Sequence, residues 1–356
     1  MDYVYRFPVV RGLQAHREYY IAMVPLKMLD RLFPAEDEYV LPEYRAQRKL
    51  NTTRIPEIAK YITDNRDDYV FSALSASIDG DFRFISASES NEIGILEVDM
   101  DARFLINDGQ HRKAAILKAI EEDETLLSET ISVVFFEDKG LARSQQLFTD
   151  LNKHAVKTSN SISELYDSRD VLAVITRNVV AAIPFFNEFT DKEKDILGKF
   201  SSNFFTLNTF YKANQRIVKR CDDSVRCEGF LLDFWRTVKE NISLWGEVEK
   251  KIISKVDIRE QYIVTQAVVI QALGYIGRYF YDHENVDMHA ILSKLQAINW
   301  KRNADCWQGR TIRNNGRVIS SDAASVLTSN AIKSVLGIPL TETEQLSENK
   351  FISGGK

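Results

Sequence analysis

This chain of 356 residues has few cysteines, no excess of positive charge and no long uninterrupted apolar run. Its three cysteines, Cys221, Cys227 and Cys306, are too few and too scattered for a disulfide framework. Their spacing also lacks the paired C-x2-C arrangement of a zinc site, so no metal site is predicted. The scarcity of cysteine indicates a reduced, cytoplasmic protein.

The formal net charge is −5, which gives no overall attraction to nucleic acid or anionic lipid. Binding to DNA therefore depends on local groups of lysine and arginine. The most apolar long stretch, residues 262–276, is interrupted by Gln266 and Gln271 and predicts a buried helix, not a membrane span. The first residues lack the apolar segment of a signal peptide, and no membrane partner is expected.

The most informative stretch that is present is residues 106–116, Ile-Asn-Asp-Gly-Gln-His-Arg-Lys-Ala-Ala-Ile. The apolar residues before it are typical of a strand, Asp108-Gly109 is a turn signal, and a helix-forming run begins at Arg112. Gly109 lets the backbone approach a ligand closely, and the helix dipole favours a negative charge at this end. This order of strand, glycine turn and helix predicts a phosphate-binding site.

The candidates for phosphate or nucleotide binding share a position at this turn or at the polar exit of a later helix: Gly109, Gln110, His111, Arg112, Asn152 and Lys153. A plain turn with Arg112 paired to a carboxylate, and ordinary helix capping by the last two residues, are the alternative interpretations. Asp108 and His111 are the catalytic candidates, because histidine titrates near neutral pH and the carboxylate can orient it. A helix-capping aspartate and a structural histidine are the alternatives here.

Candidates for DNA contact fall in three basic groups. One face of a predicted helix over residues 207–220 carries Lys212, Arg216, Lys219 and Arg220. A loop-like stretch around Trp307 carries Arg310 and Arg313, together with Lys301, Arg302 and Arg317. The basic stretch 45–54 carries Arg48 and Lys49. Such cations supply most of the nonspecific affinity for DNA, although solvated charged faces are the more common outcome for any one group. No helix-turn-helix or zinc-finger signature accompanies them.

The chain changes character along its length. Up to residue 165 it alternates strand and helix signals, with strands expected near 19–24, 71–78, 82–87, 93–98 and 131–136, and Asp79-Gly80 as the turn of a hairpin. Residues 166–340 carry helical spacing, with helices expected over 172–182, 207–220, 229–248, 259–281, 288–300 and 323–336. Residues 341–356 are expected to be a polar, fraying tail. This predicts an α+β protein with a mixed first domain and an all-α second domain.

Several segments resemble one known family. Asp108-Gly109-Gln110-His111-Arg112 spells the motif of the DGQHR-domain family, the DndB-like proteins of bacterial DNA sulfur modification (phosphorothioation). Residues 7–14, 47–58, 148–153, 307–309 and 336–340 resemble further blocks of that family. The resemblance covers most of the chain.

The resemblance implies a ParB/sulfiredoxin-like fold for residues 1–165, because the turn of that superfamily carries Gly-Glu-Arg-Arg or Gly-Cys-His-Arg where this chain has Gly109 to Arg112. Sulfiredoxin chemistry needs a thiolate at the position of Gln110, and an amide cannot replace it. The acidic residue of ParB is absent as well. These differences count against cytidine-nucleotide specificity and turnover, so the resemblance requires no cofactor, and a nucleotide is the candidate ligand.

The resemblance also implies a role as an accessory protein of phosphorothioation that represses or regulates the modification operon. The expected partners are the promoter DNA of that operon and other DNA sulfur modification proteins. Two alternatives stay open: a nucleotide-hydrolysing or DNA-nicking enzyme that uses the same turn, and a scaffold for other modification proteins. The chain carries no G-x4-G-K-[ST], G-x-S-x-G or H-E-x-x-H motif, so nothing in it requires an enzyme.

Overall fold

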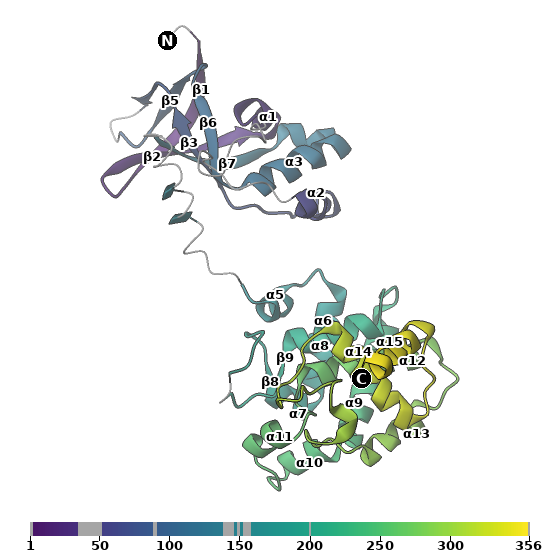
Figure 1. The fold of residues 1–356 in the computed structure, drawn as a ribbon. Coiled ribbons are helices and arrows are strands. Elements are labelled where there is room, and N and C mark those ends of the chain that lie inside the picture. The colour runs from purple at the N-terminus through teal and green to yellow at the C-terminus, as the bar shows by residue number, and fades with distance from the viewer. Residues whose placement is uncertain are drawn as a thin grey trace. The chain divides into compact units, whose positions relative to one another are not determined.

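The computed structural model describes residues 3–34, 52–87, 91–137, 146–147, 150–151, 158–198 and 201–354. Internal contacts divide the chain into two compact units, Met1–Val156 and Lys157–Lys356, which are described separately (Figure 1). The prediction that the protein contains both helices and strands is confirmed: the structure has a seven-stranded sheet and many helices. Among the described residues, no helix has both the length and the apolar composition that a membrane span needs.

The first unit is built on the seven-stranded sheet. Its strand order is β4-β5-β1-β2-β7-β3-β6, and all neighbours are antiparallel except the parallel pair β3 and β7. The strands are β1 (Val4–Gln14), β2 (Arg17–Pro25), β3 (Leu74–Asp79), β4 (Phe82–Ser86), β5 (Ile93–Asp99), β6 (Arg103–Asp108) and β7 (Thr130–Glu137).

Alternation along the strands explains why the sheet has a buried face. In β7 the side chains of Ile131, Val133 and Phe135 are buried, while the residues between them are not. That face joins the apolar sides of α2 (Ile55–Asp64) and α3 (Gln110–Glu122), which pack against each other beside the sheet (Figure 1). The unit also contains α1 (Leu29–Leu32) and the 3-10 segments Leu26–Met28, Thr52–Arg54 and Glu124–Ser128.

The predicted hairpin at Asp79-Gly80 is wrong. Both edges of β3 are occupied, by β6 and β7, so the chain after Gly80 cannot return alongside it. Residues 82–86 pair instead with β5 at the far side of the sheet.

The second unit is mostly helical, with one pair of two-residue strands, β8 (Thr190–Asp191) and β9 (Phe205–Thr206). Its helices are α5 (Asn160–Tyr166), α6 (Val171–Ala182), α7 (Pro184–Phe189), α8 (Leu207–Ile217), α9 (Ser224–Asn241), α10 (Ser243–Glu249), α11 (Lys255–Gln261), α12 (Ala267–Asp282), α13 (Met288–Leu292), α14 (Asp322–Leu336) and α15 (Glu342–Gly354), with 3-10 segments at Ser293–Ala297 and Asp305–Trp307. α5 packs against α6 and α8 and so belongs with this unit, although the sequence predicts the boundary after residue 165.

Aromatic side chains fill the core of the second unit, and small residues bring its helices together. The buried rings include Phe185, Phe186, Phe205, Phe210, Trp235 and Trp245. α12 lies close to α8 because Gly274 has no side chain: an added Cβ would sit 2.8 Å from the carbonyl oxygen of Ala213. The helices expected at 172–182 and 323–336 are confirmed as α6 and α14.

Four predicted helices are wrong in their extent. The helices expected over 207–220 and 288–300 stop at Ile217 and Leu292, and those expected over 229–248 and 259–281 are each divided into two helices. Capping contacts explain one of these boundaries: the side chain of Asp223 accepts hydrogen bonds from the amides of Val225 and Arg226, so α9 starts there.

The predicted fraying tail is also wrong, because residues 342–354 form α15. Thr341 Oγ1 accepts from the Glu344 amide at 3.3 Å, and Glu344 Oε2 accepts from the Thr341 amide at 2.9 Å. This reciprocal pair is a capping box, which satisfies two amides at the start of the helix.

Candidate functional site

The Asp108–Arg112 turn joins the end of β6 to the start of α3. Gly109 is the N-cap of the helix, with φ +103°, a backbone conformation that favours glycine. An added Cβ there would lie 2.4 Å from Leu74 Cδ2 and 3.3 Å from the guanidinium carbon of Arg112. The helix therefore begins at Gln110, two residues before the predicted start at Arg112.

Arg112 is engaged inside the unit. Its Nη2 donates to Asp108 Oδ2 at 2.6 Å, and its Nη1 donates to Ser72 O (2.7 Å), Ser72 Oγ (2.6 Å) and Ala73 O (2.7 Å). The side chain is 17% exposed. This is the arrangement of the alternative interpretation, in which Arg112 pairs with a carboxylate, and it ties the turn to the two residues that precede β3.

The other sequence-predicted residues divide by location. Gln110 and His111 are partly buried at the start of α3 and both take part in interactions. Lys113, which follows Arg112, lies 3.8 Å from Asp30, and burial lowers the pKa of its ammonium group. Asn152, Lys153, Arg48 and Lys49 lie outside the described residues.

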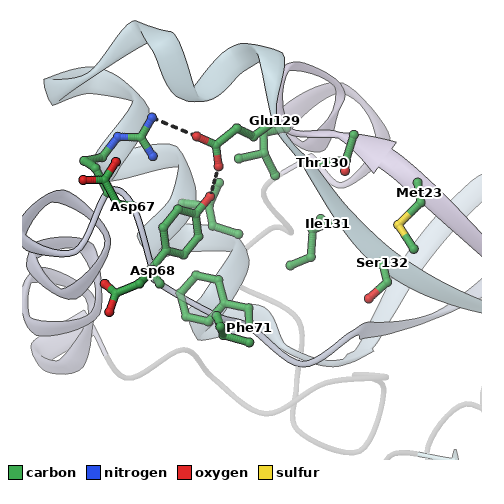
Figure 2. Close-up of a pocket in the computed structure, with 13 residues that line it drawn as sticks. Met23, Asp67, Asp68, Phe71, Glu129, Thr130, Ile131 and Ser132 are labelled. Atoms are coloured by element: carbon green, nitrogen blue, oxygen red, sulfur yellow. Dashed lines mark hydrogen bonds and ion pairs between the residues drawn. The ribbon is translucent and has the colours of Figure 1, made fainter. Parts of the chain in front are cut away.

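A pocket of about 500 Å³ lies next to the segment that Arg112 holds. Residues 66–71 form one wall, immediately before Ser72 and Ala73, and Ile116 of α3 contributes from one helical turn beyond Arg112. Residues 129–132, Met23 and Leu26 complete the lining. Figure 2 shows Asp67 and Asp68 on one side of the pocket, and Met23 and Ser132 on the other. The turn and the pocket thus share a loop and a helix.

The polar wall of the pocket is a connected network. Glu129 accepts a hydrogen bond from the Tyr69 hydroxyl and pairs with Arg66, whose Nη2 lies 2.8 Å from Glu129 Oε1 (Figure 2). Arg66 Nε donates to Asp123 Oδ2 at 2.7 Å. Burial, with the hydrogen bond to Glu129, raises the pKa of Tyr69 to about 12, so this hydroxyl stays protonated at neutral pH. The network fixes the shape of the wall.

Sequence reasoning missed this pocket. Its lining residues come from positions 23 to 132 and belong to no local motif. The nearest feature that the sequence predicted is the turn at residues 108–109, which leads into α3, the helix that supplies Ile116 to the pocket.

The basic group on α8 does not form one face. α8 ends at Ile217, so Lys219 and Arg220 lie beyond the helix, and Arg220 Nε lies 3.0 Å from Asp222 Oδ1. Arg216 pairs with Asp322 of α14 at 2.6 Å and lies over the ring of Tyr275. Lys212 is exposed. The prediction that the four cations share a helix face is wrong.

The second basic group divides into an engaged and an exposed part. Arg310 makes two hydrogen bonds to the carboxylate of Glu348 and lies over the ring of Phe351 at 4.3 Å. Arg313 and Arg317 are exposed at a turn, where the Arg313 amide donates to Arg317 O at 2.8 Å and the Gly316 amide donates to Arg313 O at 2.8 Å. Lys301 is exposed as well. We call residues 313–317 the arginine turn.

The thiols of Cys221, Cys227 and Cys306 are free. Within the described ranges, no group of three or more His, Cys, Asp or Glu side chains is arranged to hold a metal ion.

Together these features define a mixed α/β protein in which a glycine turn braces a pocket in the sheet unit and a rigid arginine turn lies in the helical unit. The family model of DndB, described as DNA-sulfur modification-associated, matches residues 7–339, nearly the whole chain. The chain belongs to this family, which confirms the DndB part of the family prediction and involves the protein in DNA sulfur modification. No curated protein and no solved structure matches the chain.

Proposed function

We propose that this protein binds duplex DNA and regulates the DNA sulfur modification system, acting as a repressor at the promoter of the modification operon. The family match over residues 7–339 carries the proposal. The arginine turn supports it: since the net charge is −5, a local group of exposed cations is what a DNA-binding surface requires.

The arginine turn is a rigid element with cations at both ends. Two backbone hydrogen bonds close it, and the Arg317 amide donates to the side chain of Asn315 at 3.1 Å. The turn therefore holds the backbone of Arg313 and of Arg317 in place, which reduces the backbone entropy lost when both side chains contact phosphates. Lys301 adds a third exposed charge in the same loop region.

For the Asp108–Arg112 turn we propose a positioning role. Arg112 fixes Ser72 and Ala73, and these residues hold the wall of the pocket formed by residues 66–71. A phosphate at this helix end would bind through backbone amides, since the Arg112 guanidinium already has four acceptors. This arrangement favours the regulator over the nucleotide-hydrolysing alternative, because Asp108 is used by Arg112.

The test is fluorescence anisotropy with a labelled duplex carrying the promoter of the operon, over a series of salt concentrations. The double variant Arg313→Ala/Arg317→Ala should bind more weakly, with a slope of log K against log salt smaller by about 1.8, at about 0.9 per lost phosphate contact. The matched control Arg236→Ala/Lys250→Ala removes two exposed charges that belong to none of the basic groups and should keep the wild-type slope. A wild-type protein that binds no duplex at about 50 mM salt would contradict the proposal.

A further inference from the structure

Two cations of the second unit lie beneath α15. Lys333 of α14 is 2% exposed, and its Nζ lies 2.6 and 2.8 Å from the two carboxylate oxygens of Glu344. Arg310 presents both terminal nitrogens to the two oxygens of Glu348. Both oxygens of Glu344 and of Glu348 are thus bound by a cation, Arg310 through a bidentate pair and Lys333 through a single ammonium group, and both kinds of contact also recognise phosphate.

An amide completes the set of donors. Asn330 Nδ2 donates to Glu348 Oε2 at 3.0 Å and to Glu344 O at 3.1 Å, and Asn330 is itself buried. A guanidinium, an ammonium group and an amide therefore converge on two anionic groups. This composition suits the oxygens of a phosphodiester as well as those of a carboxylate.

α15 is held to this surface by charge. Two of its large apolar side chains, Leu346 and Ile352, are 68% and 65% exposed, and Glu344 is its one buried residue among those described. The third, Phe351, is partly buried against Arg310, so the apolar contact of α15 is a single ring and not the apolar stripe of a helix that docks by apolar burial. Figure 1 shows α15 beside α14, the helix that supplies Lys333 and Asn330.

Lys333 and Arg310 lose their carboxylate partners when α15 moves away, and they then face water. An anion that takes the place of Glu344 and Glu348 restores these ion pairs, so it stabilises the state in which α15 is released. Arg310 lies three residues before Arg313, so this surface continues into the arginine turn.

We propose that Arg310, Lys333 and Asn330 form a binding site for the DNA backbone, and that α15 occupies it with Glu344 and Glu348 as phosphate mimics until DNA displaces them. This inference rests on the proposed function, since it extends the DNA surface from the arginine turn. The site makes α15 an internal competitor of DNA. The apparent affinity is then reduced by the fraction of molecules in which α15 is released.

The test uses the full chain with Glu344→Gln/Glu348→Gln. Glutamine removes the charge but keeps the size, and at position 344 it also preserves the capping box. The double variant Glu240→Gln/Glu342→Gln is the control, because both residues are exposed and the net charge changes equally, from −5 to −3. We expect about tenfold tighter duplex binding for the first variant relative to the control, if α15 is released about one-tenth of the time in the wild type.

Adding Arg310→Ala to the Glu344→Gln/Glu348→Gln variant should remove the gain in duplex affinity.

Hydrogen exchange of the wild-type protein gives a second measurement that needs no variant: duplex should speed exchange of the α15 amides. If inorganic phosphate accelerated it as much as duplex at equal phosphate concentration, the assignment to DNA would be wrong. If the wild type binds duplex and the Glu344→Gln/Glu348→Gln variant binds no more tightly than its control, this inference is wrong but the proposed function stands. If the wild type binds no duplex at all, the proposed function is wrong.

Discussion

Arg112 in the first unit and Arg310 in the second are engaged to a similar degree but in different ways. Their side chains are 17% and 15% exposed, and each pairs with a carboxylate. Arg112 pairs with Asp108, four residues before it in the chain, and most of the other acceptors of Arg112 are backbone carbonyls. Arg310 depends on Glu348, 38 residues later on a separate helix. The first arginine braces its own turn, whereas the second pairs with a helix that, by our inference, another anion displaces.

The largest effect should come from removing the Arg112 brace. Arg112→Met should lower the free energy of unfolding of the first unit by about 3 kcal/mol, because Asp108 and the carbonyls of Ser72 and Ala73 lose their donor. Urea unfolding followed by far-UV circular dichroism measures this loss. All four tryptophans lie in the second unit, so tryptophan fluorescence should show an unchanged transition there.

Arg103→Met, at an exposed position of β6, is the matched control for Arg112→Met and should change the stability by less than about 0.5 kcal/mol. If both variants behaved alike, Arg112 would not be a brace, and a ligand-binding role for its guanidinium would regain support.

This comparison also separates what sequence reasoning could predict from what it could not. The strand, the Asp108-Gly109 turn and the following helix depend on neighbouring residues, and all three were predictable. Whether Arg112 faces a ligand or a carboxylate was left open, since Ser72 is 40 residues away and no local pattern brings it close.

The second unit shows the same limit. The Thr341-x-x-Glu344 signature of a capping box was present in the sequence, but the polar composition of residues 341–356 favoured a fraying tail. Its cationic partners, Arg310 and Lys333, come from other elements. The basic face expected on α8 failed for a related reason: it depended on one helix continuing three residues beyond Ile217.

The next largest effect is expected at the turn itself. Gly109→Ala should destabilise the first unit by about 2 kcal/mol, because alanine is strained at φ +103° and its Cβ would lie 2.4 Å from Leu74 Cδ2. Gly229→Ala, in an exposed position of α9 with nothing within 4 Å of the added carbon, should instead stabilise the second unit by about 1 kcal/mol. Thermal unfolding of both variants measures these opposite signs. A neutral Gly109→Ala variant would mean that the turn tolerates a different backbone.

Particular carboxyl groups of the two units should also respond oppositely to pH. In the first unit, hydrogen bonds and ion pairs with Arg83 and Arg6 hold the pKa of Glu97 below its ordinary value, and hydrogen bonds from Thr125 do the same for Asp123. A lowered pKa in the folded state contributes stability above the ordinary value and loses it as the pH falls. The first unit should therefore lose stability on acidification.

In the second unit, burial raises the pKa of Glu164 to about 8, with Asp195 and Asp170 acting in the same direction and Lys212 against it. The folded state then binds a proton that the unfolded state has released, so stability falls as the pH rises from about 5 to about 8. Glu164→Gln should remove this slope and stabilise the second unit by about 1 kcal/mol at pH 9, a value reduced for the partial exposure of the group. Urea unfolding at pH 5 and pH 9, followed by tryptophan fluorescence, measures the effect; parallel pH profiles for wild type and variant would contradict it.

The smallest effect is expected where an arginine pairs with an exposed carboxylate. Arg216→Ala should lower the free energy of unfolding of the second unit by about 0.5 kcal/mol, because the side chain of Asp322 is 86% exposed and water replaces the lost partner. Its contact with the ring of Tyr275 accounts for part of this small value. Arg310→Ala, which leaves Glu348 without its cation beneath α15, should cost more in the same assay. If Arg216→Ala proved as costly as Arg310→Ala, the Arg216–Asp322 and Arg310–Glu348 ion pairs would be equivalent, and nothing in their energetics would single out the pair covered by α15.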